Sequence, residues 1–295
     1  MRSHRARALA VVLVAALLTG VAGCGDDDDG APATSATTST TKTSTTSTST
    51  TTTNVAPAEE TEVRAYFLRD EKVGPVARAA TEEAVATGAM EGLLLGPTKD
   101  EQELGFTSAI PTGTELLGVN IAEGTATVDL SDEFGSGGGS ASMMGRVAQV
   151  VFTLTQFPTV DSVLFELEGE PVTALGGEGL LLSEPQTRAD WEDITPAILV
   201  EAPLPFAEVT SPLRLTGTAN TFEAMFRVNV TDGDGLIVFD EPAMATSGTG
   251  TRGTFDVTAT FEVPRAGIGA LIVFESSAKD GSPINIVEVP LRLPG

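Results

Sequence analysis

The stretch ELLGVNIAEGTATVDLS, residues 115–131, holds two apolar segments on either side of a Glu-Gly pair. In its second half Ala126, Val128 and Leu130 alternate with polar residues. A period of two is typical of a strand with one buried face, and a glycine-containing pair between two such segments is typical of a tight turn. We therefore expect a β-hairpin here.

One helix is expected on each side of this hairpin. Before it, Thr81 is a candidate N-cap, followed by two glutamates and by apolar residues near helical spacing, and Gly96-Pro97 ends the element. After it, Ser140 is a candidate N-cap for a second apolar face, which Pro158 stops.

Two further segments have the composition of strands, VRAYFL at 63–68 and SVLFELEG at 162–169. Together with the hairpin and the two helices, they predict an α+β domain, a mixed sheet with two helices, over residues 60–185.

In the last third of the chain three segments alternate apolar and polar residues, and four further segments are short and mostly apolar, all separated by Gly, Pro and Asp. Their number and spacing are typical of an immunoglobulin-like β-sandwich, expected over residues 190–295. The junction between the two domains is expected at residues 180–195, around Trp191. The predicted strands are 197–202, 212–217, 224–230, 236–240, 255–261, 270–275 and 287–293.

Residues 1–23 have the order of a secretory signal peptide: arginines, an apolar run from Ala8 to Leu18, then small residues up to Cys24. The run is shorter than the roughly 20 residues that span a bilayer. Val21-Ala22-Gly23-Cys24 resembles the bacterial lipobox, which implies cleavage before Cys24 and lipid on its sulfur. We expect Cys24 to hold the protein on the extracytoplasmic face of the cell membrane. An ordinary signal peptide with a nearby cysteine is the alternative.

Residues 24–58 are expected to form a disordered linker. Between Thr34 and Thr53, 18 of 20 residues are Ser or Thr. Such a segment has no apolar surface to offset the entropy cost of ordering, and its composition suits a stalk.

The formal net charge of −24 disfavours several partners. Removal of the signal peptide takes away arginines and no acidic residue, so the mature chain is more acidic still. Such a charge repels nucleic acid and anionic head groups. We therefore expect no nucleic acid partner, and contact with the membrane through the Cys24 anchor.

The histidine content bears on catalysis, because His4 is the one histidine and lies in the signal peptide. With Cys24 acylated, Ser-His-Asp and Cys-His chemistry are excluded, and the usual ligands of a catalytic zinc are missing. The 41 acidic residues allow a glycosidase-like carboxylate pair, but no motif identifies one. We expect no enzyme and no catalytic, cofactor-binding or metal-binding residue.

Three motifs are better explained by turns and loops. GTGTRG at 248–253 precedes a strand rather than a helix, unlike a dinucleotide loop. DGDG at 232–235 lacks an EF-hand's glutamate, since position twelve from Asp232 is Ala243, so a turn is expected. GSGGGS at 135–140 holds no Lys or Arg for a phosphate, and a mobile cap on the following helix is expected.

Two long stretches resemble known bacterial domains. Residues 91–134, with Gly96-Pro97 and VDLS at 128–131, and residues 149–172, with TLTQFP at 153–158, resemble the GerMN domain of sporulation and germination proteins. In them Asp129 and Ser131 are expected to satisfy backbone groups at a strand end.

The second resemblance is to the immunoglobulin-like domain of Gmad type that often follows GerMN, and it covers residues 198–228 and 276–293. Together the two resemblances imply an extracytoplasmic, surface-tethered lipoprotein with no catalytic residues to carry over. GerMN domains are thought to resemble ring-building modules of secretion machinery, which implies assembly in an envelope complex.

We therefore expect a non-catalytic, membrane-anchored lipoprotein that assembles with unidentified envelope proteins, in a process like sporulation or germination or in cell-wall or division-related complexes. The alternative is a module that binds wall glycan or a small ligand. Sugar binding favours exposed aromatics, and the chain has one Trp and one Tyr. An enzyme that uses carboxylates alone is the third hypothesis.

Overall fold

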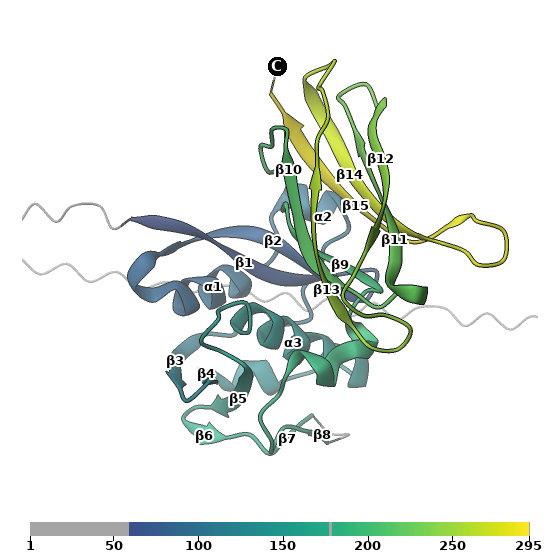
Figure 1. Cartoon of the computed structure of the whole chain (residues 1–295). Coiled ribbons are helices and arrows are strands. Elements are labelled where there is room, and N and C mark those ends of the chain that lie inside the picture. Colours follow the sequence, from purple (N-terminus) through teal and green to yellow (C-terminus); the bar gives the residue numbers. More distant parts are fainter. Residues whose placement is uncertain (1–58, 177–178, 295) are drawn as a thin grey trace, which may run out of the picture. The chain divides into compact units, whose positions relative to one another are not determined.

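A computed structural model describes residues 59–176 and 179–294 (Figure 1). The predicted signal peptide, linker and Cys24 lie outside the described residues. The described chain begins with a mixed α/β region and continues as strands, as the sequence predicts. Among these residues, no helix is both long and apolar enough to cross a bilayer.

The first region contains both helices and strands. Its elements are β1 (Glu60–Arg69), β2 (Lys72–Thr81), the 3₁₀ turn η1 (Glu82–Ala84), α1 (Val85–Leu94), α2 (Lys99–Glu103), β3 (Leu116–Ala122), β4 (Thr125–Leu130), η2 (Asp132–Gly135), α3 (Ser140–Leu154), β5 (Ser162–Leu167), β6 (Glu170–Pro171), β7 (Ala174–Leu175) and β8 (Leu180–Leu181).

The second region follows the 3₁₀ segment η3. Its elements are η3 (Arg188–Ile194), β9 (Ile198–Ala202), β10 (Leu213–Ala219), η4 (Phe222–Ala224), β11 (Met225–Thr231), β12 (Ile237–Met244), β13 (Gly253–Ala259), β14 (Gly267–Ser276) and β15 (Pro283–Leu293).

The predicted hairpin is confirmed as the antiparallel pair β3 and β4. Its turn residues Glu123 and Gly124 both have positive φ, 51° and 81°, which matches the twist of a two-residue hairpin turn. After α3 crosses over, β5 pairs with β4 in parallel, in a sheet of order β3-β4-β5-β6. The hairpin is therefore the start of the mixed sheet that the sequence predicts.

Side chains of α3 and of Gln156, two residues after its end, pair with the free edge of β1. Gln156 accepts a hydrogen bond from the Arg64 N–H at 2.8 Å and donates to the Arg64 carbonyl at 2.6 Å. Thr153 Oγ1 accepts from the Tyr66 N–H at 3.0 Å, and Gln149 donates to the Tyr66 carbonyl at 3.2 Å. An amide side chain offers the same donor and acceptor as a peptide unit, so these residues act in place of a third strand beside β1 and β2.

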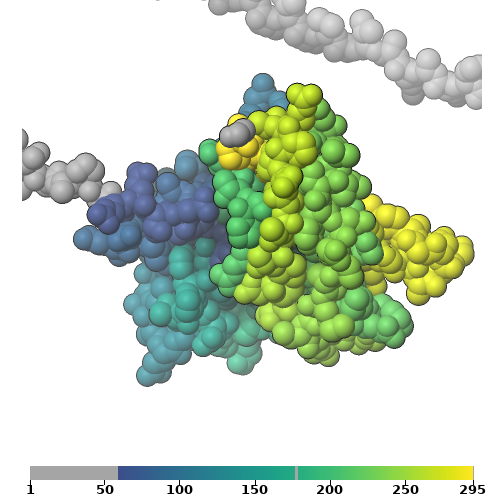
Figure 2. All heavy atoms as spheres, turned by 45° about the horizontal axis from the view of Figure 1, so that its top comes forward, coloured from purple at the N-terminus to yellow at the C-terminus, as the bar shows by residue number. Residues whose placement is uncertain are grey.

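The seven strands predicted for the second region are confirmed. They form two sheets, of order β13-β10-β9 and β12-β11-β14-β15, with an apolar core between them. Phe226 and Phe255 meet across this core with ring centroids 4.9 Å apart. In Figure 2 the yellow residues around the turn from β14 to β15 project from the body of the molecule. The region is thus a sandwich held by packing.

Trp191, expected at the junction, belongs to the core of the first region. Its side chain is buried there together with Ile194 of η3 and Leu199 of β9. The first strand of the sandwich therefore contributes to both cores, because its neighbours Ile198 and Val200 lie in the second core.

Neither predicted N-cap makes the expected cap. Thr81 is the last residue of β2 and precedes η1, so α1 begins only at Val85. Ser140 is the first residue of α3, and Gly139 occupies the cap position. The helix ends are as expected: α1 stops before Gly96, whose φ is 78°, and α3 stops before Pro158.

The strand β2 and the helix α2 are among the elements that have no counterpart in the sequence-based expectations. The strand β2 pairs with β1 along its whole length, although it contains Gly74 and Pro75, which are rare in strands. The helix α2 is only five residues long and begins with a capping box between Thr98 and Glu101. That box, a Thr followed three residues later by a Glu, is a signal that the sequence contains.

Candidate functional site

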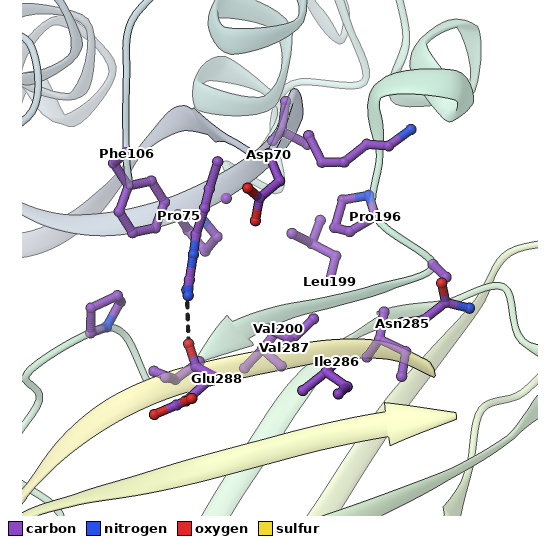
Figure 3. Close-up of a pocket in the computed structure, with 18 of the residues that line it drawn as sticks. Asp70, Pro75, Phe106, Pro196, Leu199, Val200, Asn285, Ile286, Val287 and Glu288 are labelled. Atoms are coloured by element: carbon purple, nitrogen blue, oxygen red, sulfur yellow. Dashed lines mark hydrogen bonds between the residues drawn. The ribbon is translucent and has the colours of Figure 1, made fainter. Parts of the chain in front are cut away.

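An apolar groove of about 250 Å³ lies between the first region and the edge strands β9 and β15 of the sandwich (Figure 3). Phe106 and Pro75 lie on the side of the first region, whereas Ile286 and Val287 lie along β15. The remaining apolar lining comes from Val73 and Val289, from Ile198, Leu199 and Val200 of β9, and from Pro196, Ala197, Pro203 and Pro205.

The groove lies where both sheets of the sandwich end. β9 is the last strand of one sheet and β15 the last strand of the other. Two arginines of β1 cap carbonyls of these strands: Arg64 donates to the Glu201 carbonyl at 3.3 Å and Arg69 to the Glu288 carbonyl at 2.9 Å. Edge strands carry unpaired backbone groups, so the first region protects part of each edge.

A partly buried ionic cluster joins the first region to β9. The Glu201 carboxylate accepts a hydrogen bond from the Tyr66 hydroxyl and another, at 2.8 Å, from the Arg188 guanidinium. Arg188 also donates to Thr155 Oγ1 at 2.8 Å, and its guanidinium lies 4.8 Å from the centroid of the Phe152 ring. The cluster thus connects β1, α3, η3 and β9.

Burial and charge set the protonation of this cluster. Burial raises the pKa of the Tyr66 hydroxyl far above its usual value. The hydroxyl therefore stays protonated and donates a hydrogen bond to Glu201. Burial also acts to raise the pKa of Glu201, but the charge of Arg188 and the hydrogen bonds from Tyr66 and Arg188 outweigh it, and the pKa is lowered. The Glu201 carboxylate is therefore ionised beside Arg188.

A second ionic contact fixes η3 to the sandwich. Arg252 donates two hydrogen bonds to the Glu192 carboxylate, at 2.8 and 3.0 Å, in the paired geometry that makes such contacts strong. Asn220 donates to the same carboxylate at 2.8 Å, and Lys72 of β2 donates to the Asp193 carbonyl. η3 thus binds both regions, and we call η3 with its Glu201 and Arg252 contacts the η3 clamp.

Several predicted site features take the structural roles expected for them. Asp129 accepts a hydrogen bond from the Gly169 N–H and Ser131 one from the Glu115 N–H, both at 3.0 Å. Asp232 accepts from two N–H groups of its own turn, which confirms the turn expected at 232–235.

The two glycine-rich motifs also lie in loops. Residues 248–252 connect β12 and β13, as predicted. The GSGGGS loop differs from the mobile cap expected, because Arg146 of α3 donates to the carbonyls of Phe134, Ser136 and Gly137 at 2.5 to 3.2 Å. These bonds hold the loop to the helix and occupy the guanidinium.

The groove and its ionic contacts were not predicted from the sequence. Tyr66 is 122 positions from Arg188 and 135 positions from Glu201, and the three residues lie in different elements. Sequence spacing therefore does not reveal that they are in contact. One signal existed: Glu201 interrupts the apolar run ILVEA, and a carboxylate in a largely buried strand needs a partner. Among the described residues, no three His, Cys, Asp or Glu side chains are placed to hold a metal ion.

Comparisons with known proteins support the two-region reading. The Germane family model, described as sporulation and spore germination, matches residues 64–173. The Gmad2 model, described as an immunoglobulin-like domain of bacterial spore germination, matches residues 197–282. A search of curated proteins returns no match.

Solved structures of similar chains include the first GerMN domain of the sporulation protein GerM from Bacillus subtilis, at 27% identity and a TM-score of 0.36, covering 44% of this chain and 99% of that one. The tandem GerMN domains of the same protein match at 19% identity and 0.38, covering 62% and 60%. A Clostridium perfringens protein with a provisional lipoprotein name matches at 19% and 0.34, covering 46% and 92%.

Proposed function

We propose that this chain, which carries a Germane domain of the sporulation and spore germination family followed by a Gmad2 immunoglobulin-like domain, is a non-enzymatic assembly protein of the bacterial cell envelope. In this proposal Cys24 carries the lipid anchor, the Ser/Thr-rich segment spaces the domains from the membrane, and the groove of Figure 3 binds another envelope protein.

The observation that carries the proposal is the η3 clamp beside an apolar groove. Two regions joined by paired charges present one preorganised surface, and a preorganised surface loses less entropy on binding than two loosely connected domains. The chemistry that the groove offers is apolar area and strand edge, which are the usual elements of protein recognition.

Binding of wall glycan is less well supported. Sugar rings stack on exposed aromatic faces, and of the residues that line the groove only Phe106 is aromatic. Phe106 is 4% exposed, so its ring is not available for stacking. The same lining suits apolar side chains of a protein partner.

The test is photo-crosslinking in the native membrane. A photo-reactive amino acid replaces Ile286, which lines the groove, and in a matched control it replaces Ile237, an isoleucine of similar exposure (58% and 53%) on the opposite edge of the same sheet. We expect discrete envelope proteins to be captured from position 286 and not from 237. Capture of wall fragments alone, or equal capture from both positions, would contradict the proposal.

The anchor is tested separately with Cys24→Ala. We expect this variant to lose incorporation of labelled palmitate and to leave the membrane fraction, because one thiol is present for acylation. Retention of the label on the variant would refute lipidation at Cys24.

A further inference from the structure

The outer edge of β15 is already covered over its second half. Phe206 donates its N–H to the Pro290 carbonyl at 2.7 Å, and Val209 donates to the Arg292 carbonyl at 3.0 Å. The segment around Phe206 and Val209 is therefore paired with β15 in the manner of an additional strand. This edge of the sandwich accepts strand pairing.

Toward the start of β15 the coverage ends. Arg69 occupies the carbonyl of Glu288, and in an antiparallel ladder alternate residues face outward, so Ile286 follows Pro290 and Glu288 as the next outward residue. Ile286 is 58% exposed, and within the described residues no hydrogen bond from outside the sheet reaches its backbone. The N–H groups of Ile286 and Glu288 and the Ile286 carbonyl are thus available to a further strand.

The register of β15 changes immediately before this stretch. Asn285 has a φ of 51° and lies where the pairing between β14 and β15 shifts. A bulge bends its strand and is common at sheet edges, and beyond this one β15 pairs with β14 again at Ile284 and Pro283. The unpaired stretch is therefore short and directed at the groove, with Ile286 and Glu288 among the lining residues.

The volume of the groove indicates what size of group can enter it. Its volume of about 250 Å³ is below the roughly 300 to 1,000 Å³ of pockets that enclose small organic ligands. Its walls include Val73, Leu199 and Val287, and it lies directly beside the free edge of β15 (Figure 3). An apolar side chain carried by a strand on that edge matches both the volume and the position.

We propose that the edge of β15 from Ile286 to Glu288 binds an extended segment of another envelope protein as an added strand, with one large apolar side chain in the groove and basic residues beside it. This proposal rests on the proposed function and specifies the partner's chemistry. In strand addition the main-chain hydrogen bonds supply affinity and the pocket for a side chain supplies specificity.

Charge favours a different protein over a second copy of this chain. Two copies that each carry a net charge of −24 repel one another. At the groove, Arg69 and Lys72 direct their charged ends at backbone carbonyls, whereas the carboxylates of Asp70 and Glu288 are exposed. A lysine or arginine next to the apolar residue of the partner would meet these carboxylates.

The experiment uses the purified full chain and phage-displayed random peptides of about ten residues, the upper end of natural strand length. We expect enriched peptides with a large apolar residue flanked by Lys or Arg. Ile286→Asp should weaken binding of the synthetic peptide at least about tenfold, and Ile237→Asp should leave it unchanged. Circular dichroism on both variants shows that the fold is intact.

Hydrogen exchange distinguishes strand addition from simple apolar contact. With peptide bound, the amides of Ile286 and Glu288 should exchange at least about tenfold more slowly. Binding without this protection, binding that survives Ile286→Asp, or no enriched peptide would each overturn the proposal. A dimer that dissociates in Ile286→Asp on ultracentrifugation would overturn it in favour of a second copy.

This outcome is separable from that of the proposed function. Crosslinking of envelope proteins from position 286 in membranes, with no peptide binding in vitro, would leave the assembly function standing and reject the added strand. Peptide binding in vitro with no crosslink in membranes would support the added strand and reject the assembly function.

Discussion

Glu201 is a carboxylate in a strand whose neighbours are apolar, and its hydrogen-bond donors come from other elements. Tyr66 belongs to β1 and Arg188 to η3, and the Arg188 and Glu201 side chains are 26% and 17% exposed. Desolvation of a carboxylate is costly, and here it is offset by a cation and a hydroxyl at hydrogen-bond distance. Stability at this residue thus depends on all three groups being present.

We predict that Glu201→Gln lowers the free energy of unfolding by about 3 kcal/mol, because the partly buried Arg188 and the buried Tyr66 then lack their acceptor charge. Urea denaturation measures the change. The matched control is Asp256→Asn, which removes an ion pair with Arg214 whose side chains are 56% and 70% exposed. The control should unfold like the wild type, and equal losses in both variants would contradict the prediction.

A pH dependence follows from the lowered pKa of Glu201. The unfolded chain takes up a proton near the ordinary value of 4.5 and the folded chain only at lower pH. The stabilisation by Glu201 is therefore fully present above pH 4.5 and is lost as the pH falls from there through the folded-state pKa. Denaturation at a series of pH values should show a shallower acid loss in Glu201→Gln, and parallel curves would refute the assignment.

At the scale of elements, two glycines stand at irregular positions of two sheets and have opposite surroundings. Gly217 lies where the pairing of β10 with β9 shifts, and Gly118 where that of β3 with β4 shifts. A Cβ on Gly217 would lie 2.0 Å from the Leu199 carbonyl oxygen, whereas a Cβ on Gly118 would meet nothing within 4 Å. The close approach of β10 to β9 therefore requires a glycine only at position 217.

We predict that Gly217→Ala destabilises the protein by about 1–3 kcal/mol or more, since β9 must move away and β9 also lines the groove. Gly118→Ala, the matched control on an edge strand, should change stability by less than about 0.5 kcal/mol. Thermal unfolding followed by circular dichroism measures both. Similar effects of the two substitutions would show that the bulge geometry is not what position 217 requires.

At the scale of the whole described chain, η3 connects two separate apolar cores. Arg188 and Glu192 in η3 bind Glu201 and Arg252 of the sandwich, and Trp191 and Ile194 between them are buried in the first core. A segment anchored on both sides transmits unfolding of one core to the other. The two regions are thus expected to unfold together.

We predict a single calorimetric transition for the full chain and two separated transitions for Arg188→Met with Arg252→Met, because both charged contacts of the η3 clamp are then lost. The control pair, Arg214→Met with Arg227→Met, removes two more exposed ion pairs on the sandwich. It should keep one transition. Two transitions in the wild type would show that the two regions unfold separately and would contradict the prediction.

The sequence by itself determined the architecture, since periodicity is a local property. Alternation around residues 115–131 predicts the hairpin, alternation and short apolar segments in the last third predict the seven strands, and Gly96 and Pro158 mark helix ends. The strand β2 was not predicted because Gly74 and Pro75 weaken its local strand propensity. Its pairing with β1 stabilises the strand despite that weak propensity. The helix α2 was not predicted either, although its capping box between Thr98 and Glu101 is a sequence signal for a helix start.

Only the tertiary structure decided where the site lies. Arg69 and Glu288, which meet beside the groove, are 219 positions apart, and no local pattern relates them. The depth of the groove and the free edge at Ile286 depend on how β1, β9 and β15 approach one another, which is a property of packing and of paired charges. Composition and periodicity describe each element alone, so they specify which faces are buried, but not which edges remain free.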